Sequence, residues 1–419
     1  MERNRNNNKL SLKVLHFTSG PIDGGAAKGA IRLHDGLLNN GINSIFLSED
    51  ISNNTKKNVY EIDYFSKHIK KNLNKIYHKL IFLPYKKNGI FSLSNSPFNT
   101  YSGLIHDADI YHFHWISRSI NILDIAKLAK NKTVIVTLRD MWWFTGGCHY
   151  SNDCDQYKSG CGACPQLNSD NNYDISSKEA LLKNKLLQNV YFVGISDWIS
   201  GEAKKSHVLS KKNIPTIYNS YDRNIFSISR EKKTDLKKEF FINTDRKIIL
   251  MGSAHNGLAY KGISKSLEII HLLSDSYHFL FFGNNTSVFI KALSQKCSYS
   301  ELGFVDEHIL AKLYNIADIF IMPSTQEAFG KTIIESIACG TPVITFKNSA
   351  PGELTQFFYE EKSVFLDDYK NIGLPNLIEY VVKNYDHKSA SKKAAKNFSN
   401  NKIANDYIKL YEAILENNR

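Results

Sequence analysis

The feature that most constrains the fold is a series of short, continuous apolar runs, each followed by a turn and a helical pattern. In the first half of the chain these runs are Lys13–Thr18, Ser44–Leu47, Ile110–Phe113, Val134–Thr137 and Val190–Ile195. Strands buried on both faces of a parallel sheet read in this continuous way. A glycine-containing turn over residues 19–25 and a helical pattern over residues 26–38 separate the first two runs. Strand, turn, helix and strand form the unit of an open parallel α/β sheet.

A second series of the same kind begins in the other half of the chain. Its apolar runs are Lys247–Gly252, His278–Gly283, Ile319–Pro323 and Pro342–Phe346. A chain of 419 residues exceeds the size at which one hydrophobic core stops growing. The pattern therefore predicts two α/β domains, over residues 1–222 and 223–397, with the polar stretch 221–245 as linker. An amphipathic pattern near the end predicts a terminal helix over about 398–419.

The amino-acid composition limits the class of protein but does not indicate a function. Hydrophobic residues make up 42% of the chain, which is enough for packed cores, and 53 Lys and Arg against 41 Asp and Glu leave a net charge of +12. No run of about 18 apolar residues predicts a membrane-spanning helix. The polar start of the chain does not resemble a signal peptide. We therefore expect a cytoplasmic protein that binds something anionic: nucleic acid, a membrane surface or a small molecule.

The most informative stretch of the sequence is residues 323–344. A strand ends at Pro323, the following loop carries Glu327, and a helix begins near Gly330 with Glu335 on its early turns. The first turn of such a helix offers free backbone N–H groups and a positive dipole end to an anion. Ligands of open α/β sheets bind at the carboxyl ends of the strands, and this is such an end. By itself, the Glu pair could equally be a solvated loop acid and an ordinary helix acid.

The surrounding pattern resembles the signature of glycosyltransferase family 4, a large retaining family with the GT-B fold. Glu327 and Glu335 flank Phe329-Gly330, and Cys339-Gly-Thr-Pro-Val-Ile344 follows. Gly303-Phe-Val-Asp306 and Ala350-Pro-Gly-Glu353 occur in the expected order around them. The resemblance implies an α/β protein with two Rossmann-like domains, whose parallel sheets face an interdomain cleft. It also implies that the terminal helix packs back on the first domain.

The family's functional roles transfer to the residues that match its motifs. Glu327 would contact the transferred sugar and Glu335 the ribose of a nucleotide donor, while Phe329 and Gly330 would lend backbone amides near the nucleotide. Lys261, in Lys261-Gly262, would stabilise the diphosphate leaving group without a metal. The family usually places an Arg shortly upstream, where this chain reads Gly252-Ser-Ala-His-Asn-Gly257. His255 and Tyr260 are the nearest occupants of that position.

Matches in the first half are shorter. Gly24-Gly25, before the first helix, resembles the turn where the family's backbone approaches donor phosphates or acceptor; two glycines in a turn can also be purely steric. His114, in Asp109-Ile-Tyr-His-Phe-His114, matches a His that touches the transferred sugar, although a strand-edge His is the plainer alternative. Arg139 replaces a family His directly before Asp140. We expect Arg139 to supply positive charge, and both residues to serve acceptor binding or an auxiliary role.

Four cysteines, Cys148, Cys154, Cys161 and Cys164, cluster within an insert at about residues 142–165. In a cytoplasmic protein, clustered thiols favour a metal over disulfides. A structural zinc ion would hold this polar, Gly-rich loop in one conformation. The spacing is not that of two C-x2-C knuckles, so reduced thiols, disulfides and an iron–sulfur cluster stay open. A similar Cys-bearing insert occurs in a polysaccharide-synthesis subgroup of family 4.

The positive charge concentrates in one stretch, Lys56–Lys87, which holds nine Lys and only two acids, Glu61 and Asp63. Apolar residues recur there at roughly helical spacing, which suits an amphipathic helix lying on an anionic membrane. A solvated basic face over the domain core is the alternative. Nucleic acid is disfavoured because no nucleic-acid-binding motif accompanies the charge.

Together these features predict a retaining glycosyltransferase. The expected donor is a nucleoside-diphosphate sugar, and the expected acceptor is a lipid-linked saccharide of a bacterial surface polysaccharide, such as lipopolysaccharide or capsule. No cofactor is expected in the chemistry, and the enzyme would sit peripherally on the inner face of the cell membrane. A GT-B sugar-nucleotide epimerase and a non-catalytic sugar-nucleotide-binding or membrane-docking protein are the alternatives.

Overall fold

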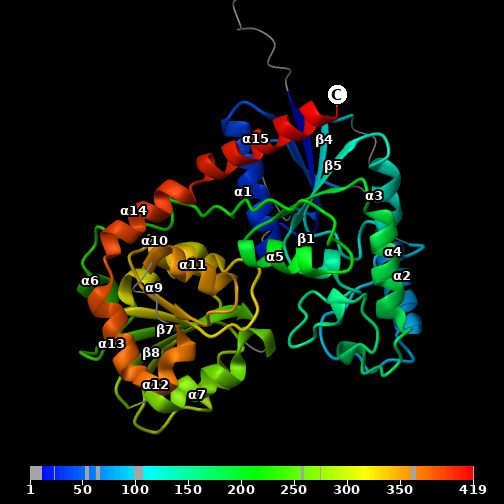
Figure 1. Ribbon diagram of the computed structural model, residues 1–419. Helices are drawn as coiled ribbons and strands as arrows, with labels where there is room; N and C mark the ends of the chain where they lie inside the picture. Colours follow the sequence, from blue (N-terminus) through cyan, green and yellow to red (C-terminus); the bar gives the residue numbers. More distant parts are fainter. Residues whose placement is uncertain are drawn as a thin grey trace, which may run out of the picture. The chain divides into compact units, whose positions relative to one another are not determined.

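The computed structural model describes residues 12–22, 24–51, 56–62, 67–98, 107–255, 259–273, 275–359 and 365–418. The side chains of residues 67–71, 254–255 and 259 lie outside this description. The chain divides into two compact units (Figure 1). Unit 1 comprises residues up to 195, 199–217 and 400–419, and unit 2 comprises residues 196–198 and 218–399. The division falls after Ile217, where the sequence predicted it after Asp222.

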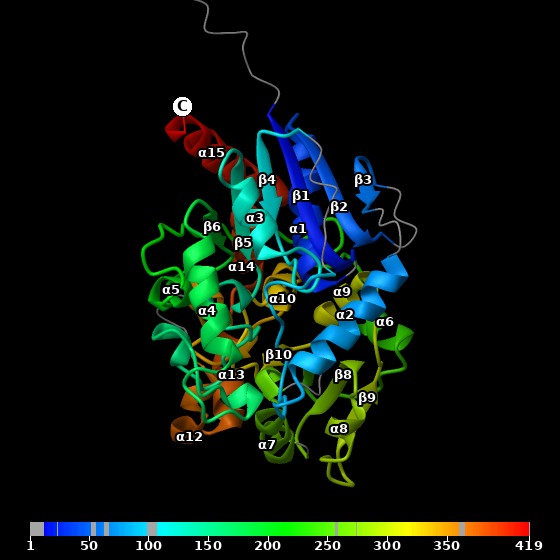
Figure 2. The same ribbon diagram turned by 90° about the vertical axis from the view of Figure 1, so that its right-hand side faces the viewer.

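Unit 1 is built on a six-stranded parallel sheet in the order β3-β2-β1-β4-β5-β6. The strands are β1 (Lys13–Pro21), β2 (Asn43–Asp50), β3 (Val59–Glu61), β4 (Ile110–Phe113), β5 (Thr133–Leu138) and β6 (Tyr191–Gly194). Figure 2 shows β1 between β2 and β4. The chain therefore reverses its direction of travel across the sheet between β1 and β4, which makes the carboxyl ends of these two strands the switch point of the unit.

The helices of unit 1 are α1 (Gly25–Asn39), α2 (Lys67–Ile81), α3 (Ile122–Leu128), α4 (Ile175–Leu186), most of α5 (Asp197–Lys205) and α15 (Asn400–Asn417). Helix α15, in red in Figure 1, contacts α1 although the two are far apart in the sequence. Their backbones approach closely at Gly36, where an added Cβ would lie 2.8 Å from the Cβ of Ala404. Tyr407 and Tyr411 of α15 are buried, so the terminal helix completes the core of unit 1.

Unit 2 repeats this topology with five parallel strands in the order β11-β10-β7-β8-β9. The strands are β7 (Ile248–His255), β8 (His278–Asn284), β9 (Ser298–Glu301), β10 (Ile319–Met322) and β11 (Val343–Thr345). The helices are α6 (Lys233–Glu239), α7 (Ile263–Leu273), α8 (Ser287–Ile290), α9 (Glu307–Ile316), α10 (Lys331–Ala338), α11 (Ala350–Tyr359), α12 (Tyr369–Ile372), α13 (Leu374–Asn384) and α14 (His387–Asn397). The switch point of this unit lies between β7 and β10.

Two parallel sheets with the Rossmann strand order agree with the predicted α/β class. The edge strands β3 and β9 carry no continuous apolar run, so the sequence pattern did not indicate them. The stretch 221–245, predicted as a linker, contains α6, which contacts α9 and buries Leu236. Within the described ranges, no helix has both the length and the apolar character needed to cross a membrane.

Candidate functional site

The switch point of unit 2 brings the predicted donor-site residues Lys261 and Glu327 into contact. Lys261 ends the short helix η4 (Ala259–Lys261), which follows β7, and Glu327 lies in the loop after β10. The Lys261 Nζ and a Glu327 carboxylate oxygen form an ion pair, and each side chain is about one-fifth exposed, at 20% and 18%. A cation and an acid therefore meet where α/β sheets bind their ligands.

The backbone explains why Lys261 is followed by glycine. Gly262 has a φ of +73°, and an added Cβ would lie only 1.8 Å from the carbonyl oxygen of Pro323. The two loops are also joined by a hydrogen bond, in which the N–H of Thr325 donates to the carbonyl of Tyr260 over 2.9 Å. This close approach of the loops after β7 and β10 sets Lys261 beside Glu327. Residues 256–258, which include the end of the stretch 252–257 that stands where the family usually places an Arg, lie outside the described part of the chain.

Helix α10 begins directly behind this ion pair. Its N-cap is Gly330 at φ +86°, and its first turn contains no acid, so its free N–H groups face no opposing carboxylate of their own turn. The side chain of Phe329 is buried, and its ring lies 6.3 Å from that of Tyr218 and 6.4 Å from that of Phe398. This aromatic packing fixes the backbone that leads into the helix.

Glu335 lies on the inner side of α10 and is fully buried. The Nζ of Lys331, one turn earlier, is 3.3 Å from its Oε1. Burial raises the pKa of the Tyr314 hydroxyl well above its usual value, and the negative charge of Glu335 adds to that rise. A buried carboxylate beside a single ammonium group can accept hydrogen bonds from ligand hydroxyls, as the predicted contact with a ribose requires.

Glu353, in the first turn of α11, contacts a segment that lies far from it in the sequence. Its carboxylate accepts hydrogen bonds from the N–H groups of Asp197, at 3.0 Å, and Trp198, at 2.8 Å. The hydroxyl of Ser196 donates to the carbonyl of Ala328, at 2.7 Å. Burial raises the pKa of Glu353, while these N–H bonds oppose the rise. Glu353 therefore anchors residues 196–198 next to the loop that carries the acid pair.

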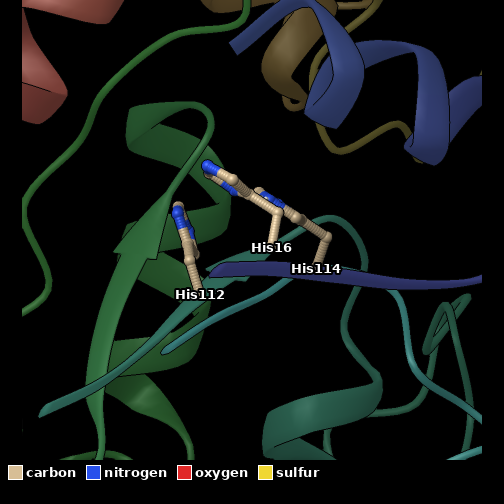
Figure 3. Close-up of side chains that lie close together, drawn as sticks. All are labelled: His16, His112 and His114. Carbon is tan, nitrogen blue, oxygen red and sulfur yellow. Dashed lines mark hydrogen bonds between the residues drawn. The ribbon is translucent and has the colours of Figure 1, made fainter. Parts of the chain in front are cut away.

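In unit 1, the predicted residues lie along β1 and β4 and at their carboxyl ends. Gly24 is the N-cap of α1, with no acid in its first turn, and Gly25 has no neighbouring atom within 4 Å of a built Cβ. His114 directly follows β4 and is fully buried. Its ring belongs to a cluster with His16 and His112, whose side chains rise from neighbouring strands on the same side of the sheet (Figure 3). The sequence singled out His114 but assigned no role to His16.

Arg139 and Asp140, at the end of β5, point to different partners. An Arg139 guanidinium nitrogen lies 3.3 Å from Nδ1 of His114. The carboxylate of Asp140 accepts three hydrogen bonds, from the Trp142 N–H at 2.9 Å, the Trp115 indole N–H at 2.8 Å and the His149 Nδ1 at 2.6 Å. Asp140 thus ties the start of the Cys-rich insert to the loop after β4. Its hydrogen-bonding capacity is largely used within the protein.

The four cysteines of the insert are unpaired, and their thiols are close enough to raise one another's pKa values. Burial raises the pKa of Cys148 and Cys164, and it raises that of Cys161 to about 12. Backbone N–H groups point at two of the sulfurs: Gly146 donates to Cys161 Sγ over 3.2 Å, and residues 166 and 167 donate to Cys164. Such N–H···S bonds favour a thiolate, which is the form that binds a metal.

The thiol chemistry therefore fits a thiophilic metal such as zinc, but the four sulfurs are not drawn into a tight tetrahedral set. Among the described residues, the one group of three or more His, Cys, Asp or Glu side chains with ligating atoms all within 4.8 Å of one another is His16, His112 and His114. Lys183 lies beside the insert, fully buried, and donates to the carbonyls of Trp142 and Thr145. Burial lowers its pKa to about 8.

The basic stretch forms helix α2, which has one packed side and one exposed side. Tyr77 and Ile81 pack against a cluster that includes Phe91 and Leu167. Beside this packed side, apolar residues are exposed at spacings of three and four: Leu73 at 38%, Ile76 at 56% and Leu80 at 58% on the helix, and Leu83 at 69% just beyond its end. Exposed Lys75 and Lys79 flank this stripe. Residues 63–66 and the side chains of 67–71, which complete the predicted basic face, lie outside the described part.

A cavity of about 1280 Å³ in unit 1 opens elsewhere, at the amino ends of the strands. Its lining includes Asp109 before β4, Thr133 of β5, Tyr191 of β6 and Glu412 of α15. Ligands of open α/β sheets bind at the opposite, carboxyl ends. Because of its position at the amino ends, this cavity is not the predicted binding site, and the switch points remain the candidate sites.

Known proteins that resemble this chain in sequence include glycosyltransferases. Residues 232–409 match the family described as glycosyl transferases group 1. The O-antigen biosynthesis glycosyltransferase WclY of Escherichia coli is 30% identical over 211 residues, covering 48% of this chain and 56% of the relative. The N,N'-diacetylbacillosaminyl-diphospho-undecaprenol alpha-1,3-N-acetylgalactosaminyltransferase of Campylobacter jejuni is 25% identical over 189 residues, covering 43% of this chain and 50% of the relative. The chain thus spans about half the length of these curated relatives.

Solved structures resemble the whole chain. A glycosyltransferase from Rickettsia africae superposes with a TM-score of 0.64 at 18% identity, covering 97% of this chain and 100% of that one. Anabaena Alr3699/HepE, in complex with UDP and glucose, gives a TM-score of 0.63 at 13% identity, covering 96% and 100%. At these identities the likeness shows the fold alone. It confirms the predicted α/β class with two Rossmann-like domains, as in GT-B glycosyltransferases.

Proposed function

We propose that this protein is a glycosyltransferase that moves a sugar from a nucleoside-diphosphate donor to a saccharide acceptor. The observation that carries the proposal is the contact of Lys261 with Glu327 at the switch point of unit 2. Both residues lie in the segment that matches glycosyl transferases group 1. The finer placement, in family 4 and in its polysaccharide-synthesis subgroup with a Cys-rich insert, is part of the proposal.

The donor would bind unit 2 with its diphosphate at Lys261 and at the first turn of α10. Glu335 would accept hydrogen bonds from the ribose hydroxyls, and the backbone of Phe329 and Gly330 would contact the nucleotide. When a diphosphate enters, the Lys261 ammonium exchanges the carboxylate of Glu327 for phosphate oxygens. Glu327 is then released to face the transferred sugar, where its negative charge stabilises the positive charge that develops as the sugar–phosphate bond breaks.

The chemistry needs no divalent metal, because the leaving diphosphate is stabilised by an ammonium group and by helix N–H groups. The proposed outcome is retention of configuration at the transferred carbon. In unit 1, Gly24 and Gly25 would lie near donor phosphates or acceptor, and His114 would contact the sugar. Arg139 and Asp140 are auxiliary: Arg139 acts through His114, and Asp140 holds the Cys-rich insert in place.

The proposed acceptor is a lipid-linked saccharide of a bacterial surface polysaccharide. One relative is named for O-antigen biosynthesis, and another for transfer to a diphospho-undecaprenol-linked sugar. An acceptor of that kind is presented at a membrane. Helix α2 offers a matching surface, since its exposed apolar stripe is bordered by Lys75 and Lys79. We propose that α2 docks on an anionic membrane surface, as interfacial helices of this composition do.

A structural zinc ion at Cys148, Cys154, Cys161 and Cys164 is a separate part of the proposal. The backbone N–H groups directed at two of the sulfurs support it. Such an ion would hold the insert together and take no part in transfer. The four thiols would move closer on binding, because zinc takes sulfur ligands at about 2.3 Å in a tetrahedron.

A donor screen tests the activity. Purified protein is incubated with UDP-, GDP- and TDP-sugars, and release of the nucleoside diphosphate is measured with and without lipid-linked acceptors. Lys261→Ala and Glu327→Ala are each expected to lower turnover by roughly 10²-fold or more, the loss typical of a transition-state charge contact. Lys265→Ala is the matched control, because Lys265 forms an exposed ion pair with Glu268 on helix α7 of the same unit.

The outcomes separate the alternatives. Near-full activity in both site variants would overturn the assignment of Lys261 and Glu327. Conversion of the donor to a different sugar nucleotide without acceptor would identify an epimerase. Binding of a nucleoside diphosphate, seen as a thermal shift, without turnover of any donor would favour a non-catalytic protein.

A further inference from the structure

Three of the buried histidines of unit 1 look, by distance alone, like a transition-metal site. His16 lies on β1, and His112 and His114 lie on and just after β4; one ring nitrogen of each falls within 4.8 Å of the others. Three imidazoles are a common ligand set for zinc and related metals. Whether they can bind one depends on where their protons lie, which the neighbouring groups determine.

Arg139 determines the proton position on His114. Its guanidinium nitrogen is 3.3 Å from Nδ1 of His114. A guanidinium can only donate hydrogen bonds, so this Nδ1 must accept and carries no proton. Burial lowers the pKa of His114 well below its usual value, because a positive charge on its ring would be desolvated beside other basic groups, Arg139 among them. A neutral imidazole carries one proton, and in His114 that proton is therefore on Nε2.

His114 in turn determines the proton position on His16. Nε2 of His114 lies 3.0 Å from Nδ1 of His16, and the planes of the two rings are nearly parallel, at an angle of 10°. Since His114 donates here, Nδ1 of His16 accepts and its proton is on Nε2. That Nε2 is buried and has no hydrogen-bond partner in the described part of the chain. The two hydrogen bonds thus run in one direction: Arg139 donates to His114, and His114 donates to His16. We call this chain of three side chains the relay.

This relay opposes a metal ion. The ring lone pair of His114 is occupied by Arg139, and that of His16 is occupied by His114. Both ring nitrogens of His112 are also engaged, each at 2.7 Å, by the hydroxyls of Tyr411 and Thr137. A divalent cation would have to displace these partners in a buried site that already holds the positive charge of Arg139, at a high electrostatic cost.

We propose that Arg139 and His16 are positioning residues that hold His114 in a single neutral tautomer, with its proton on Nε2. With Nδ1 accepting from Arg139 and Nε2–H donating to His16, His114 acts neither as a general base nor as a metal ligand, and the donor left unused in the described part of the chain is Nε2–H of His16. The tautomer follows from contacts within unit 1 alone. Its consequence for a sugar ligand rests on the proposed function.

The tautomer can be read directly by NMR. Full-length protein labelled with 15N-histidine gives long-range 1H–15N correlations that distinguish protonated from bare ring nitrogens. The two rings are assigned by comparison with His16→Gln and His114→Gln. We expect both to be neutral with the proton on Nε2 at pH 6 to 8. A proton on Nδ1 of His114, or a charged His114 ring in this range, would overturn the proposal whatever the activity of the protein.

A cobalt titration tests the exclusion of metal. Wild-type protein should bind no Co²⁺ at these histidines, so His16→Gln should leave the number of bound ions unchanged. Arg139→Met removes both the blocking donor and its charge, and should gain one Co²⁺ per chain that the double variant Arg139→Met/His16→Gln lacks. Cobalt that is bound by wild type and lost in His16→Gln would refute the relay. An Arg139→Met protein with no added ion would show that Arg139 is not what excludes the metal.

Kinetics separate positioning from simple structural support. If His114 acts by donating its hydrogen bond to His16, His114→Gln, whose amide also donates, should retain several-fold more kcat/KM than His114→Ala. Wild-type kcat/KM should show no ionisation that His114→Gln abolishes between pH 6 and 8. Loss of such an ionisation in His114→Gln would identify a general base instead. An absence of any transfer activity would count against the proposed function and leave the NMR result to decide the tautomer. If Arg139→Met does not fold, the NMR measurement on the wild-type protein still decides the tautomer.

Discussion

Lys261 and Glu327 are each other's counterion at the carboxyl edge of the second sheet. They come from the loops after β7 and β10, the two strands between which the strand order reverses. Each side chain is about one-fifth exposed, so the pair stabilises the ligand-free protein by only on the order of 1 kcal/mol. A diphosphate offers Lys261 more negative charge than one carboxylate does. The ion pair is therefore suited to open when a donor binds.

Neutralising Glu327 should separate binding from turnover. In Glu327→Gln, the Lys261 ammonium no longer has to leave a carboxylate, so the nucleoside diphosphate product should bind up to about fivefold more tightly. Turnover should still fall by roughly 10²-fold, because the charge beside the reacting sugar is lost. Calorimetry with UDP, GDP and TDP and initial rates measure the two effects. Glu268→Gln, which neutralises the acid of the exposed Lys265–Glu268 pair, is the control. Weaker binding by Glu327→Gln would show that the Lys261–Glu327 ion pair does not compete with the ligand.

A methyl group at position 262 should disrupt this site. Gly262→Ala would place a Cβ 1.8 Å from the Pro323 carbonyl oxygen, at a φ of +73° that alone costs about 1–3 kcal/mol for a non-glycine residue. We expect a lower thermal midpoint and loss of nucleotide binding. Gly201→Ala is the matched control, since a Cβ there meets no atom within 4 Å and alanine favours helix α5. Equal stability of the two variants would contradict the close approach of the loops.

The sequence predicted the sheets well because buried parallel strands carry their own signal. The runs over 110–113 and 319–322 correspond to β4 and β10. Strands β3 and β9 were missed, since their short sequences, Val-Tyr-Glu and Ser-Tyr-Ser-Glu, have exposed polar residues and no apolar run, unlike the buried edge strands β6 and β11. Helix α6 was missed for a similar reason: its sequence KTDLKKE buries one residue, Leu236.

The residues of the candidate site could be predicted from the sequence only where they belong to a family motif. The motif identified Lys261 and Glu327, but their contact depends on loops that the sequence separates widely. The role of Asp140 in holding Trp115 could not be inferred, because Trp115 lies in the loop after β4, far from Asp140 in the sequence. His16 carried no signal, since a histidine within a strand gives no indication of its neighbours. The alternation of His112 with His114 was the one hint that this face of β4 is polar.

Acid should destabilise the folded protein through its buried histidines. Burial lowers the pKa values of His16, His112 and His114 well below 6.5 in the folded state. Above pH 6.5 both states hold neutral rings, whereas below it the unfolded chain binds protons that the folded one does not. Unfolding free energy should therefore fall as pH drops below about 6.5, by up to about 1.4 kcal/mol per pH unit for each histidine. Thermal midpoints from pH 7.5 to 5 measure this, and a shallower slope is expected for His16→Gln. A midpoint that stays level below pH 6.5 would contradict neutral burial.

Membrane docking should depend on the exposed stripe of α2 and on its lysines. Ile76→Ser/Leu80→Ser removes two side chains that are 56% and 58% exposed, so the fold should survive while binding to anionic vesicles falls. Lys75→Gln/Lys79→Gln should weaken binding to anionic vesicles and leave any binding to neutral vesicles unchanged. Sedimentation with vesicles of each composition measures both effects. Leu181→Ser, at a residue 59% exposed on α4, is the control. Unchanged binding by both α2 variants would make this stretch a solvated basic face.

Metal in the Cys-rich insert should appear as one zinc ion per chain in protein purified without oxygen. Burial raises the pKa values of Cys148, Cys161 and Cys164, so these thiols become thiolates only when a cation compensates the charge. Binding should release protons and weaken as the pH falls, and chelation should lower the thermal midpoint. Cys161→Ser should lose the ion, whereas Cys297→Ser, outside the insert, should retain it. Mass spectrometry of the metal content decides between the two cases. If the protein holds no stoichiometric metal, the insert is stabilised by contacts within the protein, among them those of Asp140 and Lys183. Lys183→Met should then lower the thermal midpoint, because two buried carbonyls would lose their donor.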